Sequence, residues 1–364
     1  MINKNIPHSN EYAIHHFLDG EAKLAEIHQE REKEKLGHLR IGSAGCMISE
    51  DACIGKCPQT ALARFVGYQL PTDSSTGFFQ GGTANEATWE TMITAAGLDY
   101  KSEEDIPILH TFPDGTLLTG RPDMVLGTEA DILNGEYAAF IPRLMIELKA
   151  CQATNSAAQK ILLEKPATDH LIQAATYSMF LGVPASLVYT GNVSGGISNY
   201  FTRREVGQND MSFGKIEFNL GWDQGNLYYM KGKHRIDTIV TQQGILDYFQ
   251  NISKMAREGN PNMIYQDMVD IEGNMLPFDA RKYNDILNLV DSNLPMDEWK
   301  EKLAIVTKQP YQIKYKTKRG HNPWYEVIHP DYVVEEHRYY RQDKVIKKFE
   351  MLRSARRFIY EGGK

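Results

Sequence analysis

Three charged residues in the middle of the chain have the types and spacing of a hydrolytic metal site. Asp123 ends the sequence Gly-Arg-Pro-Asp, and Glu147 and Lys149 belong to the triplet Glu-Leu-Lys at the end of an apolar stretch. Residues two apart in a β-strand point to the same face, so Glu147 and Lys149 should project together. Carboxylates suit Mg²⁺ or Mn²⁺, and a neighbouring ammonium can orient or deprotonate a water or neutralise charge on a phosphate. Taken alone, an E-x-K triplet is more often a solvated strand end.

The segments around these residues predict alternating strands and helices, which favours a layered α/β domain. We expect strands at 108–127 (two, around a Pro-Asp-Gly turn), 141–150 and 185–192, and helices at 81–98, 168–182 and 242–259. The Gly- and Ser-rich stretch 41–60 is interpreted as a loop leading into a helix, and residues 11–36 as an exposed helix. The expected units are therefore an N-terminal helical extension (1–40), a core (41–225) and a C-terminal region (226–364).

Four fragments in a fixed order carry a family resemblance. They are Gly82 with Glu86 on the upstream helix, Gly120 to Asp123, Glu147 to Lys149, and Gln173 with Tyr177 on the following helix. Together they resemble the PD-(D/E)xK nuclease superfamily, specifically its RecB-like branch, which is similar to phage and CRISPR-associated exonucleases. The resemblance covers about residues 40 to 190. It implies a restriction-endonuclease-like core, in which a central mixed β-sheet is flanked by helices, here with an extra N-terminal helix and a C-terminal extension.

The resemblance also implies a role for each residue. Asp123, Glu147 and Glu86 would bind the metal, Lys149 would act on the nucleophilic water, and Gln173 and Tyr177 would orient the site and contact DNA phosphate. Glu86 stands where the RecB branch often has His, and its alternative interpretation is an exposed helix acid. The alternative for Tyr177 is packing. The 24-residue separation of Asp123 from Glu147 is long for this unit, and the intervening Asn-Gly predicts an extended hairpin.

The four cysteines raise the question of a second metal site. Cys46, Cys53 and Cys57 lie in the Gly-rich stretch, and Cys151 follows Lys149 by two residues. In iron–sulfur members of the RecB branch three cysteines follow the Gln-x-x-x-Tyr helix, whereas here no cysteine follows residue 151. The spacing also lacks the close pairs of common zinc sites. We therefore expect buried thiols rather than an iron–sulfur cluster or zinc.

Charge is distributed unevenly along the chain. The formal net charge is −7, yet residues 301–364 hold 15 Lys and Arg against 8 Asp and Glu. Basic residues interleaved with aromatic ones suit contact with a nucleic-acid backbone and bases. The alternative, an amphipathic C-terminal helix packed on the core, stays open. The candidate DNA-binding residues are Arg121, Lys160, Tyr177, Lys316, Lys318 and Arg319.

The function expected from these features is a Mg²⁺-dependent (or Mn²⁺-dependent) deoxyribonuclease. The resemblance favours an exonuclease acting on DNA ends or single strands in recombination, repair or phage DNA replication. The alternatives are a structure-specific endonuclease or nickase, and a non-catalytic DNA-binding subunit that retains the nuclease fold. No stretch of about 18 apolar residues and no secretory pattern occurs, so we expect a cytoplasmic protein with no membrane contact. A recombination or replication partner protein and a homo-oligomer are both compatible with the sequence.

Overall fold

A computed structural model gives the positions of most of the chain. The described residues are 37–49, 52–66, 76–102, 105–131, 138–151, 165–191, 215–258, 267–274, 294–306, 312–316, 324–335, 338–350 and 352–361. The helix predicted for residues 11–36 lies outside them. Among the described residues, no helix is both long enough and apolar enough to cross a membrane.

A seven-stranded sheet forms the centre of the fold, in the order β12-β11-β10-β9-β8-β7-β4. Its strands are β4 (Tyr100–Ser102), β7 (Met124–Asp131), β8 (Ala138–Cys151), β9 (Ala185–Gly191), β10 (Lys215–Asp223), β11 (Asn226–Lys231) and β12 (His234–Thr241). The pairing of β8 with β9 is parallel and the other pairings are antiparallel. The expected α/β class with a central mixed sheet is confirmed.

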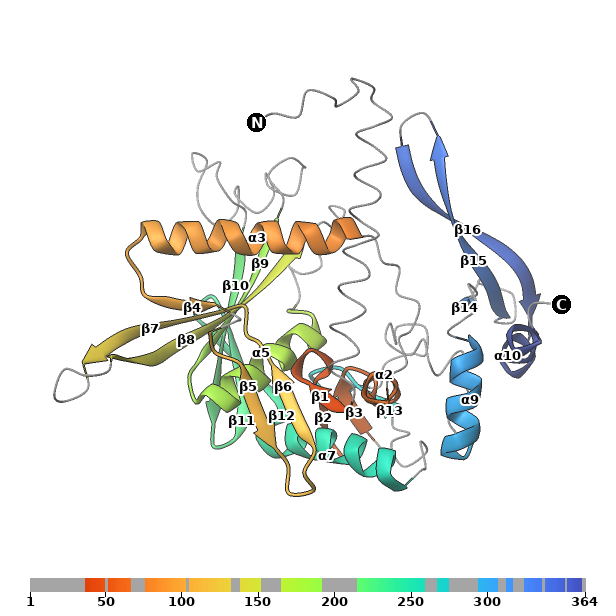
Figure 1. Cartoon of the computed structure of the whole chain (residues 1–364), viewed down its shortest axis with the longest axis horizontal. Helices are drawn as coiled ribbons and strands as arrows, with labels where there is room; N and C mark the ends of the chain where they lie inside the picture. Colours follow the sequence, from red (N-terminus) through yellow and green to blue (C-terminus); the bar gives the residue numbers. More distant parts are fainter. Residues whose placement is uncertain are drawn as a thin grey trace, which may run out of the picture.

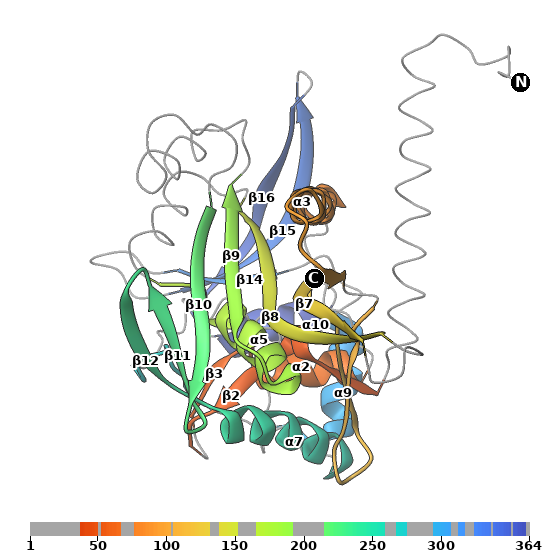
Figure 2. The ribbon, with the colours of Figure 1, turned by 90° about the vertical axis from the view of Figure 1, so that its left-hand side faces the viewer.

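Helices cover both faces of this sheet (Figure 1). On one face, Ile93 of α3 (Thr76–Ala95) packs in a small apolar cluster with Ile146 and Leu148 of β8. On the other face, α5 (Thr168–Leu181) packs on β8 and β9 within the main core. Figure 2 shows α3 end-on and separated from α5 by the sheet. The two carboxylates of the candidate site therefore come from a sheet enclosed by helices.

The helix predicted at 168–182 is confirmed as α5, and its ends follow from the sequence. Asp169 lies in its first turn, where the negative charge of a carboxylate interacts favourably with the positive end of the helix dipole. Gly182 ends the helix in the left-handed conformation, with φ of 67°. The residues between are mostly buried, which agrees with a helix covered by the sheet on one side and by further elements on the other.

The stretch 41–60, expected to be mainly loop, contains short strands, so that expectation was wrong. The elements are η1 (Ile41–Ser43), β2 (Gly45–Met47), β3 (Ala52–Gly55) and α2 (Pro58–Phe65), and β13 (Asp267–Met268) adds to β3 in parallel. The glycines there allow close packing under α7 (Gln242–Glu258). A Cβ added at Gly45 would lie 2.4 Å from the ring of Tyr248.

The expected hairpins are confirmed. β5 (Ile108–Thr111) and β6 (Leu117–Gly120) pair antiparallel, and β1 (His38–Arg40) completes a three-stranded sheet. β7 and β8 form the long hairpin that separates Asp123 from Glu147 in sequence. Met124 pairs with Ile146, so Asp123, one residue earlier, lies at the level of Glu147 on the neighbouring strand.

The C-terminal region forms a sheet of its own with two helices beside it. The elements are α9 (Met296–Val306), β14 (Gln312–Lys316), β15 (Trp324–Glu335), β16 (Arg338–Phe349) and α10 (Leu352–Tyr360). α10 is amphipathic and buries Ala355, Phe358 and Ile359 against β15, β16 and α9. The packing alternative thus holds for α10. Figure 1 shows β15 and β16 as a long ribbon beside the rest of the fold.

The central sheet includes strands that lie beyond the core expected at residues 41–225. It continues past residue 225 into β11 and β12, and α7 then packs on β2 and α2. The layered unit of the fold therefore includes part of the region that was assigned to the C-terminal extension.

Candidate functional site

Asp123, Glu147 and Lys149 come together at the ends of β7 and β8. Nζ of Lys149 donates to Oε1 of Glu147 over 2.5 Å, as expected for side chains two apart on one face of a strand. The backbone N–H of Leu148 donates to Oδ2 of Asp123 over 2.7 Å. This second bond holds the Gly-Arg-Pro-Asp turn against β8, so the carboxylate directly before β7 lies beside the one in β8.

Glu147 is the most unusual member of the group because it is completely buried. Burial and then repulsion from Asp123 raise its pKa to about 8, against the lowering effect of Lys149. Its second oxygen, Oε2, has no hydrogen-bond partner among the described residues. A buried carboxylate oxygen without a partner is costly, so this atom marks a position that a cation would stabilise.

Glu86 acts on this centre from α3 through its charge. It is half-exposed on α3, and its charge adds a smaller increase to the pKa of Glu147. Among the described residues, no three His, Cys, Asp or Glu side chains are grouped closely enough to hold a metal ion. Glu86 is therefore near enough to influence Glu147 electrostatically, and its role as a third ligand stays a prediction.

Gln173 and Tyr177 link α5 to the turn that carries Asp123. The hydroxyl of buried Tyr177 forms hydrogen bonds with the side chain of Gln173 and the backbone of Arg121, and burial raises its pKa. A Cβ added at Gly120 would lie 2.8 Å from the Tyr177 ring. The glycine of the Gly-Arg-Pro-Asp sequence thus lets this turn approach the tyrosine. The burial of Tyr177 favours packing and positioning over contact with DNA.

A second ion pair, which was not predicted from the sequence, lies near Lys149. Lys56, between β3 and α2, donates to Oδ2 of Asp169 in α5 over 2.7 Å, and both side chains are largely buried. Burial lowers the pKa of Lys56 more than Asp169 raises it, and Lys149 lowers it further. Burial also lowers the pKa of Lys149, but attraction to Glu147, Asp123 and Asp169 outweighs it. The only sequence signals were the acid in the first turn of α5 and the lysine before Cys57-Pro58.

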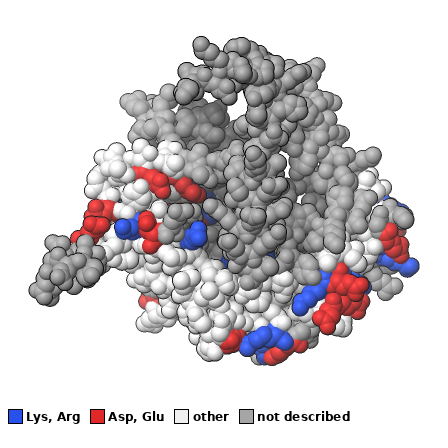
Figure 3. Space-filling view, in the orientation of Figure 1, with Lys and Arg blue, Asp and Glu red and all other residues white. Residues whose placement is uncertain are grey.

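The described members of the predicted DNA-binding set lie in different parts of the fold. Arg121 is exposed beside Asp123, and half-buried Lys316 lies in β14, where it interacts with Glu326. Lys160, Lys318 and Arg319 lie outside the described residues. On the face shown in Figure 3, the described acidic and basic side chains are interspersed rather than gathered by sign. Of this set, only Arg121 and Tyr177 are placed at the candidate site.

The interpretation of the cysteines as buried thiols is confirmed for three of them. Cys46, Cys53 and Cys57 are buried and form no disulfide with one another. Burial raises the pKa of Cys46 to about 11, and its thiol lies 3.8 Å from the carbonyl oxygen of Thr241. The side chain of Cys151 lies outside the described part of the chain.

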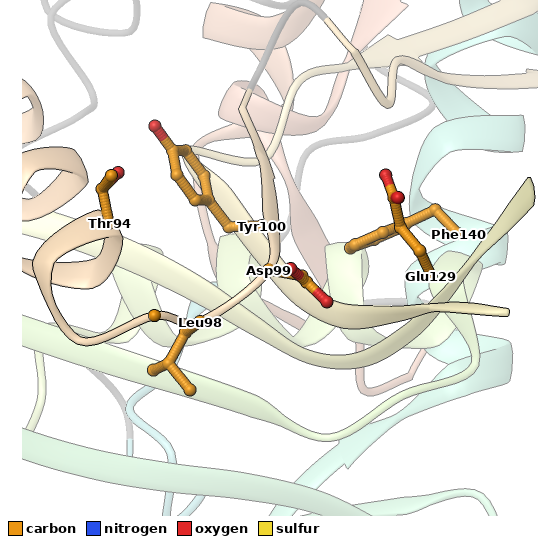
Figure 4. A pocket seen from close by; sticks show the side chains of 7 residues that line it. Thr94, Leu98, Asp99, Tyr100, Glu129 and Phe140 are labelled. Carbon is orange, nitrogen blue, oxygen red and sulfur yellow. The ribbon is translucent and has the colours of Figure 1, made fainter.

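A surface pocket of about 360 Å³ lies elsewhere, at the edge of the central sheet (Figure 4). It is lined by Thr94, Gly97, Leu98, Asp99, Tyr100, Glu129 and Phe140. Glu129 is six residues along β7 from Asp123, or roughly 20 Å at the rise of a strand. None of the predicted site residues lines this pocket, so it is separate from the carboxylate site.

The carboxylates, the two lysines and the α5 residues thus form one connected group, with Glu147 at its buried centre. The chain matches no protein-family model, no curated protein and no solved structure.

Proposed function

We propose that this protein is a metal-dependent deoxyribonuclease with a restriction-endonuclease-like core of the PD-(D/E)xK type. The observation that carries the proposal is the fully buried Glu147, whose Oε2 has no partner among the described residues, beside Asp123 and Lys149. A structural ion pair would be expected to satisfy both oxygens of a buried carboxylate. The unsatisfied Oε2 of Glu147 therefore fits a site that binds a ligand such as a metal ion.

The residues present fit a magnesium or manganese ion. Asp123 and Glu147 offer hard carboxylate oxygens from adjacent strands, and Glu86 is the predicted third contributor. Repulsion between the carboxylates, which helps to raise the pKa of Glu147, is what a divalent cation would remove. When bound, such an ion would offset the charge of the phosphodiester and make a bound water more acidic.

Lys149 contributes a positive charge and hydrogen bonds at the same place. Its ammonium has three N–H donors, and the contact with Glu147 uses one of them. Its side chain is 21% exposed, whereas that of Glu147 is completely buried. We assign Lys149 to orienting the attacking water and to stabilising the charge that develops on the phosphate. Gln173 and Tyr177 position the turn that carries Asp123.

Within this activity, the first choice is an exonuclease that processes DNA ends during recombination, repair or replication. The support is the resemblance to the RecB-like and phage enzymes, and thus analogy of sequence. A structure-specific endonuclease or nickase would use the same residues on a different DNA shape. A DNA-binding subunit that keeps the fold would bind DNA without cutting it.

The test compares linear DNA with covalently closed circles in the presence of Mg²⁺. We expect the wild type to degrade linear DNA and spare closed circles, and EDTA to stop the reaction. Lys149→Ala should lower the rate on the order of 100- to 1,000-fold, the scale of losing one electrostatic contact to a transition state. The matched control is Lys233→Ala, which removes an exposed lysine in the β11–β12 turn and should retain full activity.

Each alternative has its own outcome in that assay. Cutting of closed circles would replace the exonuclease with an endonuclease or nickase. DNA binding without metal-dependent cutting of any substrate would leave only the binding subunit. A fully active Lys149→Ala variant would refute the assignment of the site.

A further inference from the structure

One stripe of α5 leads from the buried site to the surface. His170, Gln173 and Tyr177 are three and four residues apart, so they lie along one side of the helix. Tyr177 is buried and Gln173 half-buried, while the side chain of His170 is 32% exposed. His170 thus lies where a substrate could reach it. The family resemblance implied no role for this residue.

Tyr189 fixes the orientation of the His170 ring. In the parallel pairing of β8 and β9, Tyr189 is the direct partner of Lys149, so both side chains lie on the face that α5 covers. The Tyr189 hydroxyl accepts the N–H of Ala167 over 3.0 Å and lies 3.1 Å from Nδ1 of His170. The hydroxyl can then give its own hydrogen to Nδ1, which leaves the ring hydrogen of a neutral imidazole on Nε2.

Nε2 faces the charged groups of the site without bonding to them. Asp169, in the same helix, lies 3.9 Å from Nε2 and already accepts from Lys56. No residue in the described part of the chain lies within hydrogen-bond distance of Nε2. The other charged groups that act on the ring are Lys149 of β8 and Lys56. Burial and these two ammonium groups lower the pKa of His170 to about 4, against the opposing attraction of Asp169.

We propose that His170 binds a backbone phosphate of the DNA through Nε2, as a neutral hydrogen-bond donor beside the site of hydrolysis. The proposal rests on the nuclease function above and adds a substrate contact to it. A donor on which two ammonium groups act, with its other ring nitrogen bonded to Tyr189, matches the way that proteins position nucleic-acid phosphates. Because the ring is neutral, it adds a hydrogen bond without adding to the charge of the site.

The first test uses two amides that place their N–H donors differently. The amide of His170→Gln reaches about as far as Nε2, whereas the shorter amide of His170→Asn reaches about as far as Nδ1. In a Glu147→Gln background with Mg²⁺, which keeps both lysines and in which hydrolysis should be lost, we expect Gln to keep affinity for a fluorescent linear DNA duplex within about 3-fold. Asn and Ala should each weaken binding about 10-fold, the scale of one hydrogen bond to a charged acceptor. Equal affinities of the Gln and Asn variants would overturn the proposal.

The second test asks whether the contact is neutral. At pH 7.5, removal of a neutral donor should leave the slope of log Kd against log salt concentration unchanged. Removal of a cation would reduce that slope by about 0.9, one released counterion, and this result would refute the neutral donor. Tyr189→Phe should weaken binding less than His170→Ala, and it should add nothing once His170 is gone. His234→Ala, at an exposed position in β12, is the matched control.

Activity separates this proposal from the one on which it rests. In the active enzyme, His170→Ala should raise KM and leave kcat within about 3-fold of the wild type. The reason is that the contact is equally strong in the bound substrate and in the transition state. If the wild type cuts linear DNA and His170→Ala has an unchanged KM, the contact is refuted and the nuclease stands. If the wild type cuts nothing, the nuclease is refuted, while the binding assays still measure the contact.

Discussion

The two faces of β8 differ sharply in what they contribute. Toward α3, Ile146 and Leu148 pack in a small cluster that is apolar throughout. Toward α5, Glu147 and Lys149 place two charges beside the main core and the ion pair of Lys56 and Asp169. The period of two along a strand thus separates packing from chemistry within four consecutive residues. Changes on one face should affect stability, and changes on the other should affect activity.

The largest expected effect is on the charged face. Glu147→Gln keeps the shape of the side chain but removes the charge, so we expect hydrolysis to be lost while the fold is retained. Divalent metal at about 100 times its Kd should stabilise the wild type by about 2.7 kcal/mol, and it should not stabilise the variant. Thermal unfolding with Mg²⁺ and with EDTA measures the stabilisation by metal in the wild type and in the variant. A metal-stabilised, active Glu147→Gln variant would contradict the site.

The adjacent residue should behave in the opposite way. Leu148 is 5% exposed and packs against the α3 side, so Leu148→Ala should lower the free energy of unfolding by about 2–4 kcal/mol. The activity per folded molecule should stay within about 3-fold of the wild type, because the side chain points away from the site. Urea unfolding and a DNA cleavage assay at low temperature give the two quantities. Loss of activity without loss of stability would show that the faces are not separate.

A smaller effect is expected where the site turn meets α5. An added Cβ at Gly120 would lie 2.5 Å from Ile41 and 2.8 Å from the Tyr177 ring. Gly120→Ala should therefore destabilise the fold by about 1–3 kcal/mol through overpacking and also lower activity by displacing Asp123. Gly42→Ala is the control, since nothing lies within 4 Å of its added Cβ. Unchanged melting of Gly120→Ala would refute the close packing of these motifs.

The smallest effect is expected for an ion pair between an exposed lysine and a buried glutamate in the C-terminal sheet. Lys348 lies 3.4 Å from Glu326 and over the ring of Trp324, with its side chain 63% exposed. Lys348→Ala should change the free energy of unfolding by less than about 1 kcal/mol, because solvent screens the lysine and Glu326 keeps the hydrogen bond from Nε1 of Trp324. Urea unfolding would check this. A larger change would mean that this pair contributes to stability like a buried ion pair, such as that of Glu147 and Lys149.

The parts of the fold that follow local rules could be predicted from the sequence. The common face of Glu147 and Lys149 follows from strand period, and α5 follows from its first-turn acid and terminal glycine. Contacts between distant segments could not be predicted in this way. Lys56 and Asp169 meet only because β2 and β3 pack under α5, and the glycines that permit this packing have the composition of a loop. The role of Tyr189 likewise depends on the parallel pairing of β8 and β9.

The pairing of β3 with β13 has a consequence for how the chain folds. Ala52 pairs with Asp267, and all the strands of the central sheet lie between them in sequence. Closing so long a loop is entropically unfavourable until the intervening elements have formed, so this pairing should be among the last to form. The same closure sets the shortest chain that can be expected to fold around the site. A fragment that ends at residue 225 would lack β11, β12, α7 and the partner of β3, whereas one that ends at residue 274 would keep them.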